Sequence, residues 1–327
     1  MTLSALRQAL CDFELETARA AVLDAFAPDA LIQLAHPFET LTGPEALFDH
    51  VLTALNKAWP DLERRETIVM EGDSGSGHWV GCCGYYTGAF LKPWIGIPPT
   101  GHQVAMRFHE FFRIEAGKIV EMQALWDLPE VMMQAGVWPM SPSLGREWHV
   151  PGPATQDGLQ ISGDGSAAMQ VVIDMLTGLA RFAEGGAEAM DLPRYWHPKC
   201  SWYGPSGIGT ARGISGFRNW HQIPFLRAMP NRTADVATGH LFAQGDYVGF
   251  TAWPGMRARI SGDGWLGIAP GGQEITMRSL DFWRVENGLI RENWVLVDLL
   301  HVYAQIGVDV LARMRELTKP RTGALED

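Results

Sequence analysis

The stretch that decides the fold is EFFRIEAGKIVEMQALWD, residues 110–127, because it recurs as DFWRVENGLIRENWVLVD, residues 281–298. The two stretches lie 171 positions apart, and the match runs without gaps over residues 101–137 and 272–308. Sixteen of these 37 positions are identical, whereas roughly one in sixteen is expected by chance at average composition. A repeat of this length indicates two copies of a whole domain rather than a short solenoid unit.

The domain boundaries follow from the repeat and from a segment between its copies. Residues 139–166 are rich in Pro and Gly, and their apolar period disappears, as is typical of a linker. We therefore expect one domain over residues 1–138 and a second over residues 167–327. A chain of 327 residues is long enough for two domains.

The first copy reads as helices followed by strands. Apolar residues at three- and four-residue steps predict an amphipathic helix over Ser4–Phe26, and a second helix begins at Pro44 and stops at Pro60. The rest consists of β-branched and aromatic runs bounded by glycine, which are typical of strands. These strands are expected at residues 31–36, 67–70, 79–86, 104–114 and 119–126.

The second copy repeats this order. Helices are expected over 167–183 and 215–229, and strands over 235–241, 247–253, 274–285 and 289–297. Helices followed by a meander of strands predict an α+β fold. Each domain is expected to be a cone, in which a curved antiparallel sheet wraps over the N-terminal helices and leaves a cavity at its open end.

Composition and charge exclude several classes of function. The net charge of −11 argues against bulk binding to nucleic acid or to an anionic membrane. The sequence has no long charge-free apolar run, and its N-terminus lacks the pattern of a signal peptide. The four cysteines have no CxxC spacing, so we expect reduced thiols in a cytoplasmic protein.

With the repeat aligned, the sequence resembles a known superfamily. Residues 110–127 are similar to the C-terminal hairpin of NTF2-like proteins, and residues 117–121 resemble the SnoaL-like polyketide cyclase branch. Residues 122–126 are similar to the last strand of ketosteroid isomerase, and residues 281–298 again resemble SnoaL. The resemblance implies acid–base chemistry in the cone without a metal or cofactor. It also implies that the two domains pack as a pseudo-dimer within one chain.

The resemblance assigns roles to particular positions. Glu110 and Asp281 stand where ketosteroid isomerase has the acid that donates a hydrogen bond to the enolate. His36, before Pro37, stands where that enzyme has its base, and the second copy has Gly204 there. SnoaL's own acid–base aspartate is replaced by Ala124 in the first copy and by a valine in the second, and Leu10 falls near the isomerase tyrosine.

The residues themselves support an acid–base pair in the first copy. Histidine titrates near neutrality and is suited to abstract a proton, as His36 would do. Phe108 and Phe112 share a strand face with Glu110 and would desolvate its carboxyl group. In the alternative interpretation, Glu110 pairs with a neighbouring arginine, either Arg107 or Arg113, and His36 only ends a strand.

Asp281 is the corresponding candidate in the second copy. It shares a face with Ser279 and Trp283, and a lone acid there would orient a polar group of a ligand. The alternative is an ion pair with Arg278 or Arg284.

The best-matched acids, Asp127 and Asp298, have a different interpretation. Asp127 is followed by Pro129 and Glu130, which resembles a capping box at the start of a helix. Asp298 begins the equivalent helix. We therefore predict structural roles for both aspartates.

Aromatic residues suggest a ligand cavity. The thirteen tryptophans are numerous for this length, and several lie close in sequence to His221 in the second copy. The alternative is ordinary core or interface packing. The candidate ligand-binding residues are Phe108, Phe112, Trp126, Tyr203, His221, Trp253 and Trp283. No motif has the spacing of a metal site, so none is predicted.

The sequence thus predicts a cofactor-independent enzyme that moves a proton on a small apolar carbonyl compound, as an isomerase, cyclase or lyase does. One alternative is a protein that binds a hydrophobic small molecule without turnover. The other is a structural or partner-binding pair of domains.

Overall fold

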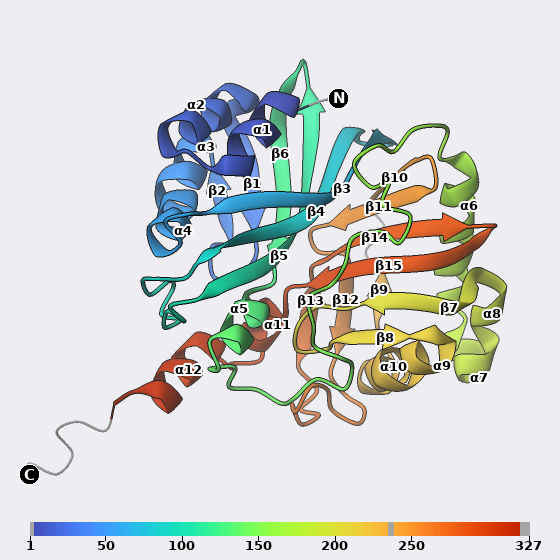
Figure 1. Cartoon of the computed structure of the whole chain (residues 1–327). Coiled ribbons are helices and arrows are strands. Elements are labelled where there is room, and N and C mark those ends of the chain that lie inside the picture. Colours follow the sequence, from blue (N-terminus) through green and yellow to red (C-terminus); the bar gives the residue numbers. More distant parts are fainter. Residues whose placement is uncertain (1–2, 235–238, 321–327) are drawn as a thin grey trace, which may run out of the picture.

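The computed structural model describes residues 3–234 and 239–320 and contains a six-stranded sheet in each half of the chain (Figure 1). The strand order of the first sheet is β2-β1-β6-β5-β4-β3, and that of the second is β10-β11-β14-β15-β7-β8. Helices precede the strands in both halves, so the predicted α+β class and the predicted pair of cone domains are confirmed.

The first half packs its helices against one face of its sheet. The helical segments are α1 (Ser4–Asp12), α2 (Leu15–Ala25), α3 (Pro44–Ala46), the π-helical turn η1 (Leu47–Leu52), α4 (Thr53–Ala58) and α5 (Leu128–Gln134). The strands are β1 (Phe26–Leu34), β2 (Thr40–Thr42), β3 (Glu63–Ser74), β4 (Gly77–Ala89), β5 (Gln103–Glu115) and β6 (Lys118–Trp126).

The second half repeats this plan with some interruptions. Its helical segments are α6 (Ser166–Leu179), α7 (Phe182–Ala189), α8 (Leu192–Tyr195), α9 (Gly213–Phe217), η2 (Arg218–Gln222), α10 (Ile223–Ala228), α11 (Leu299–Gln305) and α12 (Val310–Thr318). The strands of its large sheet are β7 (Trp196–Tyr203), β8 (Thr210–Arg212), β10 (Gly239–Gln244), β11 (Tyr247–Ala252), β14 (Ser279–Glu286) and β15 (Leu289–Val297). A small sheet contains β9 (Thr233–Ala234), β12 (Met256–Arg259) and β13 (Glu274–Met277).

The structure corrects three details of the sequence analysis. The helix expected over Ser4–Phe26 is two helices, because Phe13 adopts a left-handed backbone with a φ of 45°. The sheets are mixed rather than antiparallel, since β1 pairs with β6, and β7 with β15, in parallel. The strand expected over 274–285 is divided into β13 and β14, and residues 235–238 of another expected strand lie outside the described residues.

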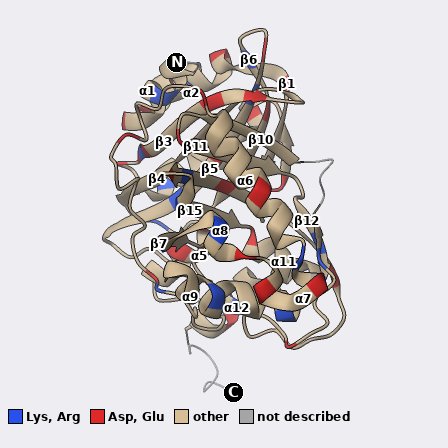
Figure 2. Cartoon of the chain, turned by 90° about the vertical axis from the view of Figure 1, so that its right-hand side faces the viewer, with Lys and Arg blue, Asp and Glu red and all other residues tan. Residues whose placement is uncertain are grey.

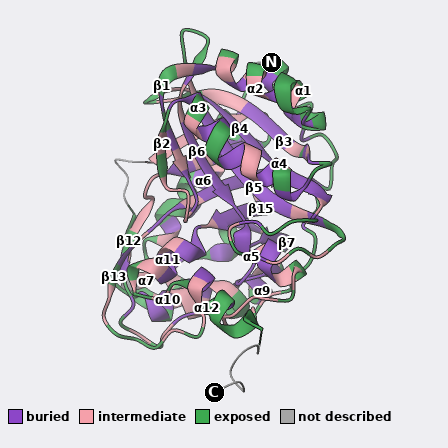
Figure 3. Cartoon of the chain, turned by 90° about the vertical axis from the view of Figure 1, so that its left-hand side faces the viewer, coloured by how far each residue is buried: buried purple, intermediate pink, exposed green. Residues whose placement is uncertain are grey.

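The sheets pack against each other through the faces that their helices leave uncovered. Phe111 of β5 stacks on Phe282 of β14 with ring centroids 4.8 Å apart, and both belong to one buried cluster shared by the two halves. In Figure 3 the strands are mostly buried and the exposed residues are mainly in helices and loops. The two halves therefore form one pseudo-dimer within the chain.

A repeated contact fastens this interface. Asp127 caps α5 by accepting a hydrogen bond from the Glu130 N–H, and its Oδ2 also accepts the Ser206 N–H at 2.9 Å. Asp298 caps α11 in the same way, and its Oδ2 accepts the His36 N–H at 2.9 Å. The predicted capping roles are confirmed, and each aspartate also binds backbone of the other half.

Within the described residues, no helix has the length and apolar character needed to cross a membrane. Charged residues are scattered over the face shown in Figure 2 and do not gather by sign.

Candidate functional site

The first cone holds Glu110 in a network of paired charges. The side chain is 1% exposed, and its Oε2 accepts a hydrogen bond from Arg64 at 2.7 Å. Its Oε1 accepts hydrogen bonds from the Tyr86 hydroxyl and the Trp126 indole, both at 3.0 Å. Arg64 also pairs with Glu66. Both carboxylate oxygens thus have partners, and the charge is neutralised by Arg64 rather than by the arginines considered from the sequence.

Little space remains in the first cone. The cavity beside Glu110 has a volume of about 20 Å³ and is lined by Phe112, Met122 and Trp126 among others. Phe108 is covered by the Arg64 guanidinium, which lies 4.3 Å from its ring centroid. The predicted ligand-binding residues of this half therefore pack against their own core.

His36 lies at the end of β1, at the boundary between the two halves. Its Nδ1 is 2.9 Å from Glu39 Oε1, and its N–H donates to Asp298 of the second half. The described contacts of Glu110 and His36 have no residue in common, so the structure does not bring this pair together. A catalytic role for the pair stays a prediction.

The second cone holds Asp281 in a different environment. Asp281 is 8% exposed and accepts a hydrogen bond from the Ser279 hydroxyl at 2.8 Å. Burial raises the pKa of this carboxyl group to about 7. The group therefore exchanges a proton with little cost at neutral pH.

The alternative ion pair of Asp281 with Arg278 or Arg284 is absent, because both arginines have other partners. Arg278 pairs with Asp298 and Glu39, and Arg284 pairs with Glu292 and Glu286. Asp281 is thus desolvated, and among the described residues no arginine or lysine is paired with it.

His221 reaches the same cone interior. Its ring stacks on Trp202 of β7 with ring centroids 3.9 Å apart. In the sheet, Trp202 lies opposite Asn293 of β15, which in turn lies opposite Trp283 of β14. Strands β7 and β14 are separated by two strand spacings, about 10 Å. Burial lowers the pKa of His221 to about 3, so the ring is neutral at pH 7.

Six buried side-chain atoms of this half have no hydrogen-bond partner among the described residues. Two of them belong to predicted ligand residues: Nδ1 of His221, and Nε1 of Trp283, which lies two residues after Asp281 on the same strand face. Buried polar atoms are usually paired, and a bound molecule would supply what these atoms lack.

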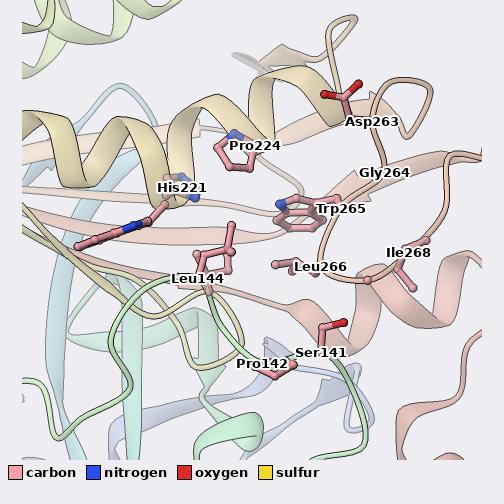
Figure 4. Close-up of a pocket in the computed structure, with 13 residues that line it drawn as sticks. Ser141, Pro142, Leu144, His221, Pro224, Asp263, Gly264, Trp265, Leu266 and Ile268 are labelled. Atoms are coloured by element: carbon pink, nitrogen blue, oxygen red, sulfur yellow. The ribbon is translucent and has the colours of Figure 1, made fainter.

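A pocket of about 320 Å³ opens beside His221 (Figure 4). Helical residues Trp220, His221 and Pro224 form one wall, and the loop 263–268 forms another. A third wall comes from linker residues Ser141, Pro142 and Leu144. Asp281 does not line this pocket and lies deeper in the cone, on the sheet.

Two predicted ligand residues lie outside the cones. Tyr203 belongs to the cluster between the sheets and donates its hydroxyl to Glu292 at 3.0 Å. Trp253 packs against the same cluster, under the Arg278 guanidinium. Because side chains alternate along a strand, Trp202 and Tyr203 face opposite sides, which excludes one of them from the cone.

Sequence reasoning missed Arg64 and the linker wall. Arg64 is 46 residues from Glu110, and no local pattern links them. The linker was recognised by its prolines and glycines, but these do not indicate which surface it covers. In the part of the chain that the structure describes, no group of three His, Cys, Asp or Glu residues is arranged to hold a metal.

Comparison with known proteins identifies the two halves. The family model of the SnoaL-like polyketide cyclases matches residues 5–135 and again residues 174–306. The comparison with curated proteins gave no match.

Solved structures resemble one domain at a time. IdmH from Streptomyces antibioticus is 23% identical, and the match covers 41% of this chain and 95% of IdmH with a TM-score of 0.34. An NTF2-like protein from Burkholderia thailandensis is 23% identical over 41% of this chain and 94% of its own, with a TM-score of 0.32. An NTF2-like protein from Burkholderia xenovorans is 14% identical, and the match covers 43% of this chain and 97% of its own with a TM-score of 0.34. Since the family model matches most of the sequence in two successive regions, the chain belongs to the SnoaL-like polyketide cyclase family.

Proposed function

We propose that the second domain binds a small apolar carbonyl compound and moves a proton on it, without a metal or cofactor. The observation that carries this proposal is the buried carboxyl group of Asp281, whose pKa lies at about 7. A group with this pKa accepts a proton from a carbon next to a carbonyl and returns it to another atom of the same molecule.

The surroundings of Asp281 suit such a reaction. Phe250 and Val295 flank it on the neighbouring strands, so water is excluded from the carboxyl group. The buried indole N–H of Trp283 is a donor without a partner among the described residues, and we assign to it the stabilisation of a developing enolate oxygen. We assign His221 to orientation of the ligand through its stacked, neutral ring. The first domain then serves as the structural partner of this site.

A specific observation favours a second candidate function. Asp281 does not line the 320 Å³ pocket, whereas His221 and Trp265 do. A hydrophobic molecule held at the mouth alone would not meet the carboxyl group. In that case the protein binds a small molecule without turnover. For either function we expect a cytoplasmic location, because the four cysteines are free thiols.

Deuterium exchange separates these functions without knowledge of the natural substrate. The protein is incubated in D2O with 2-tetralone, an apolar ketone, and deuterium uptake next to the carbonyl is followed by mass spectrometry. We expect uptake above the buffer rate, and about a hundredfold less for Asp281→Asn. Asp24→Asn, at an exposed position, is the matched control and should exchange like the wild type.

The same experiment tests the other candidates. Binding of 2-tetralone, seen as tryptophan quenching, with no uptake above buffer would favour the non-catalytic binding protein. Loss of uptake in Glu110→Gln with retention in Asp281→Asn would place the chemistry in the first domain and contradict the proposal.

A further inference from the structure

The linker crosses the mouth of the second cone at a fixed place. On one side of the pocket Trp138 packs edge-on against Tyr303 of α11 with ring centroids 6.4 Å apart, and its indole donates to the Ser141 carbonyl oxygen at 3.2 Å. On the other side Gly145 N–H donates to Ile208, and Arg146 forms a two-way backbone bridge with Thr210. Residues 141–144, here named the strap, are therefore held at both ends.

The strap touches the loop on the opposite side of the mouth. A Cβ atom on Gly267 would overlap Ser141 Oγ, so the Ser141 side chain packs directly against the Gly267 backbone. Leu144 lines the pocket and is 57% exposed, and Figure 4 shows its side chain directed toward His221. An apolar side chain kept this accessible at a pocket wall is available to a ligand.

The equivalent segment of the repeat closes the first domain instead. After Gly307 the chain forms α12, which buries Val310, Leu311 and Met314. A Cβ atom on Gly96, the counterpart of Gly267, would lie 3.3 Å from the Arg315 guanidinium. The segment that follows each domain, here named its tail, thus contacts the mouth loop of the other domain.

Proline accounts for the difference between the two tails. Pro142 aligns with Arg313, whose N–H donates to the Asp309 carbonyl oxygen inside α12; proline lacks that N–H, so the linker is not helical where α12 is. Helix α12 lies against the mouth loop of the first domain, whereas the non-helical strap lines the 320 Å³ pocket of the second.

We infer that the strap is a ligand-contacting wall and that Leu144 determines the size of ligand that the second domain accepts. This inference rests on the proposed function only in so far as the second domain binds a small molecule. The linker between the domains is then part of the site.

Two fluorescent probes of different size test this inference. 2-Naphthol has two fused rings and 1-hydroxypyrene has four, and the binding of each is followed by fluorescence anisotropy. Leu144→Ala removes apolar contact and should weaken 2-naphthol about fivefold. Leu144→Trp narrows the pocket and should weaken 1-hydroxypyrene by tenfold or more while changing 2-naphthol less than threefold.

Controls separate failure of this inference from failure of the proposed site. Leu159→Ala and Leu159→Trp alter another exposed leucine of the linker, outside the pocket, and should bind both probes like the wild type. Trp220→Ala alters an exposed tryptophan of the opposite wall and should weaken both probes. If Trp220→Ala weakens binding but the Leu144 variants match the Leu159 variants, the role of the strap is refuted. If the wild type binds neither probe, or Trp220→Ala has no effect, the site and the inference both fail.

Discussion

At the scale of single residues, Glu110 and Asp281 occupy the same position of the repeat but differ in their surroundings. Glu110 is paired with Arg64, whereas the residue aligned with Arg64 in the second half is Ala234. Tyr86 and Trp126, which donate to Glu110, are replaced by methionine and valine. The same strand position therefore holds a neutralised carboxylate in one domain and a desolvated carboxyl group in the other.

The Asp281 carboxyl group makes stability depend on pH. Its pKa is about 7 in the folded chain and 3.8 in a solvated reference. Between these values the folded state holds a proton that the unfolded state has released, so stability falls as pH rises through this window. In urea denaturation at pH 8, the free energy of unfolding of Asp281→Asn should exceed that of the wild type by up to about 4 kcal/mol. At pH 4 the two proteins should have nearly the same free energy of unfolding. An equal difference at both pH values would show that Asp281 does not titrate in this way.

Glu110→Gln should have the opposite effect on stability. It leaves the buried Arg64 guanidinium without one of its two carboxylates. We expect a loss of about 3 kcal/mol in the free energy of unfolding. The double variant with Arg64→Met should lose less than the sum of the two single losses. Additive losses would contradict the coupling.

At the scale of elements, the strap depends on close approach of two glycines. A Cβ atom on Gly145 would lie 2.7 Å from the carbonyl carbon of Gly209, so Gly145→Ala should displace the backbone bridge of Arg146. We expect a loss of about 2 kcal/mol and faster trypsin cleavage after Arg146. Gly75→Ala is the matched control, because a Cβ atom there meets no neighbour. Unchanged cleavage in Gly145→Ala would show that the strap is not held by this contact.

Local sequence patterns predict the helices and strands better than they predict the side of the sheet on which each side chain lies. The hairpins 110–127 and 281–298 were placed by their alternation and glycines, and Phe108, Glu110 and Phe112 share the cone face as expected. The apolar spacing predicts one long first helix, because nothing in it marks the turn at Phe13. Aromatic character alone predicts that Tyr203 lies in the cone, although alternation along β7 directs its side chain to the interface.

At the scale of the whole molecule, the two halves are expected to unfold together. Phe111 and Phe282 stack between the sheets, and Gly81 packs directly on both rings. Phe282→Ala should cost about 3 to 5 kcal/mol and leave a single calorimetric transition at a lower temperature. Leu317→Ala, at a position 67% exposed, should change stability little. Two separate transitions in the wild type would contradict a shared core.

The duplication is readable from the sequence, whereas the proposed division of roles between the domains is not. That division depends on contacts between distant segments, such as Arg64 with Glu110 and the linker with loop 263–268. Sequence identity between the repeats says nothing about which mouth is covered by a helix and which by a strap.

We propose that the ligand site lies in the second domain rather than in the first. The most direct test is a crystal structure of the protein with 2-tetralone. We predict the ketone in the second cone, between Leu144, His221 and Asp281, and none beside Glu110. Ketone bound in the first cone, or in both cones, would contradict this account.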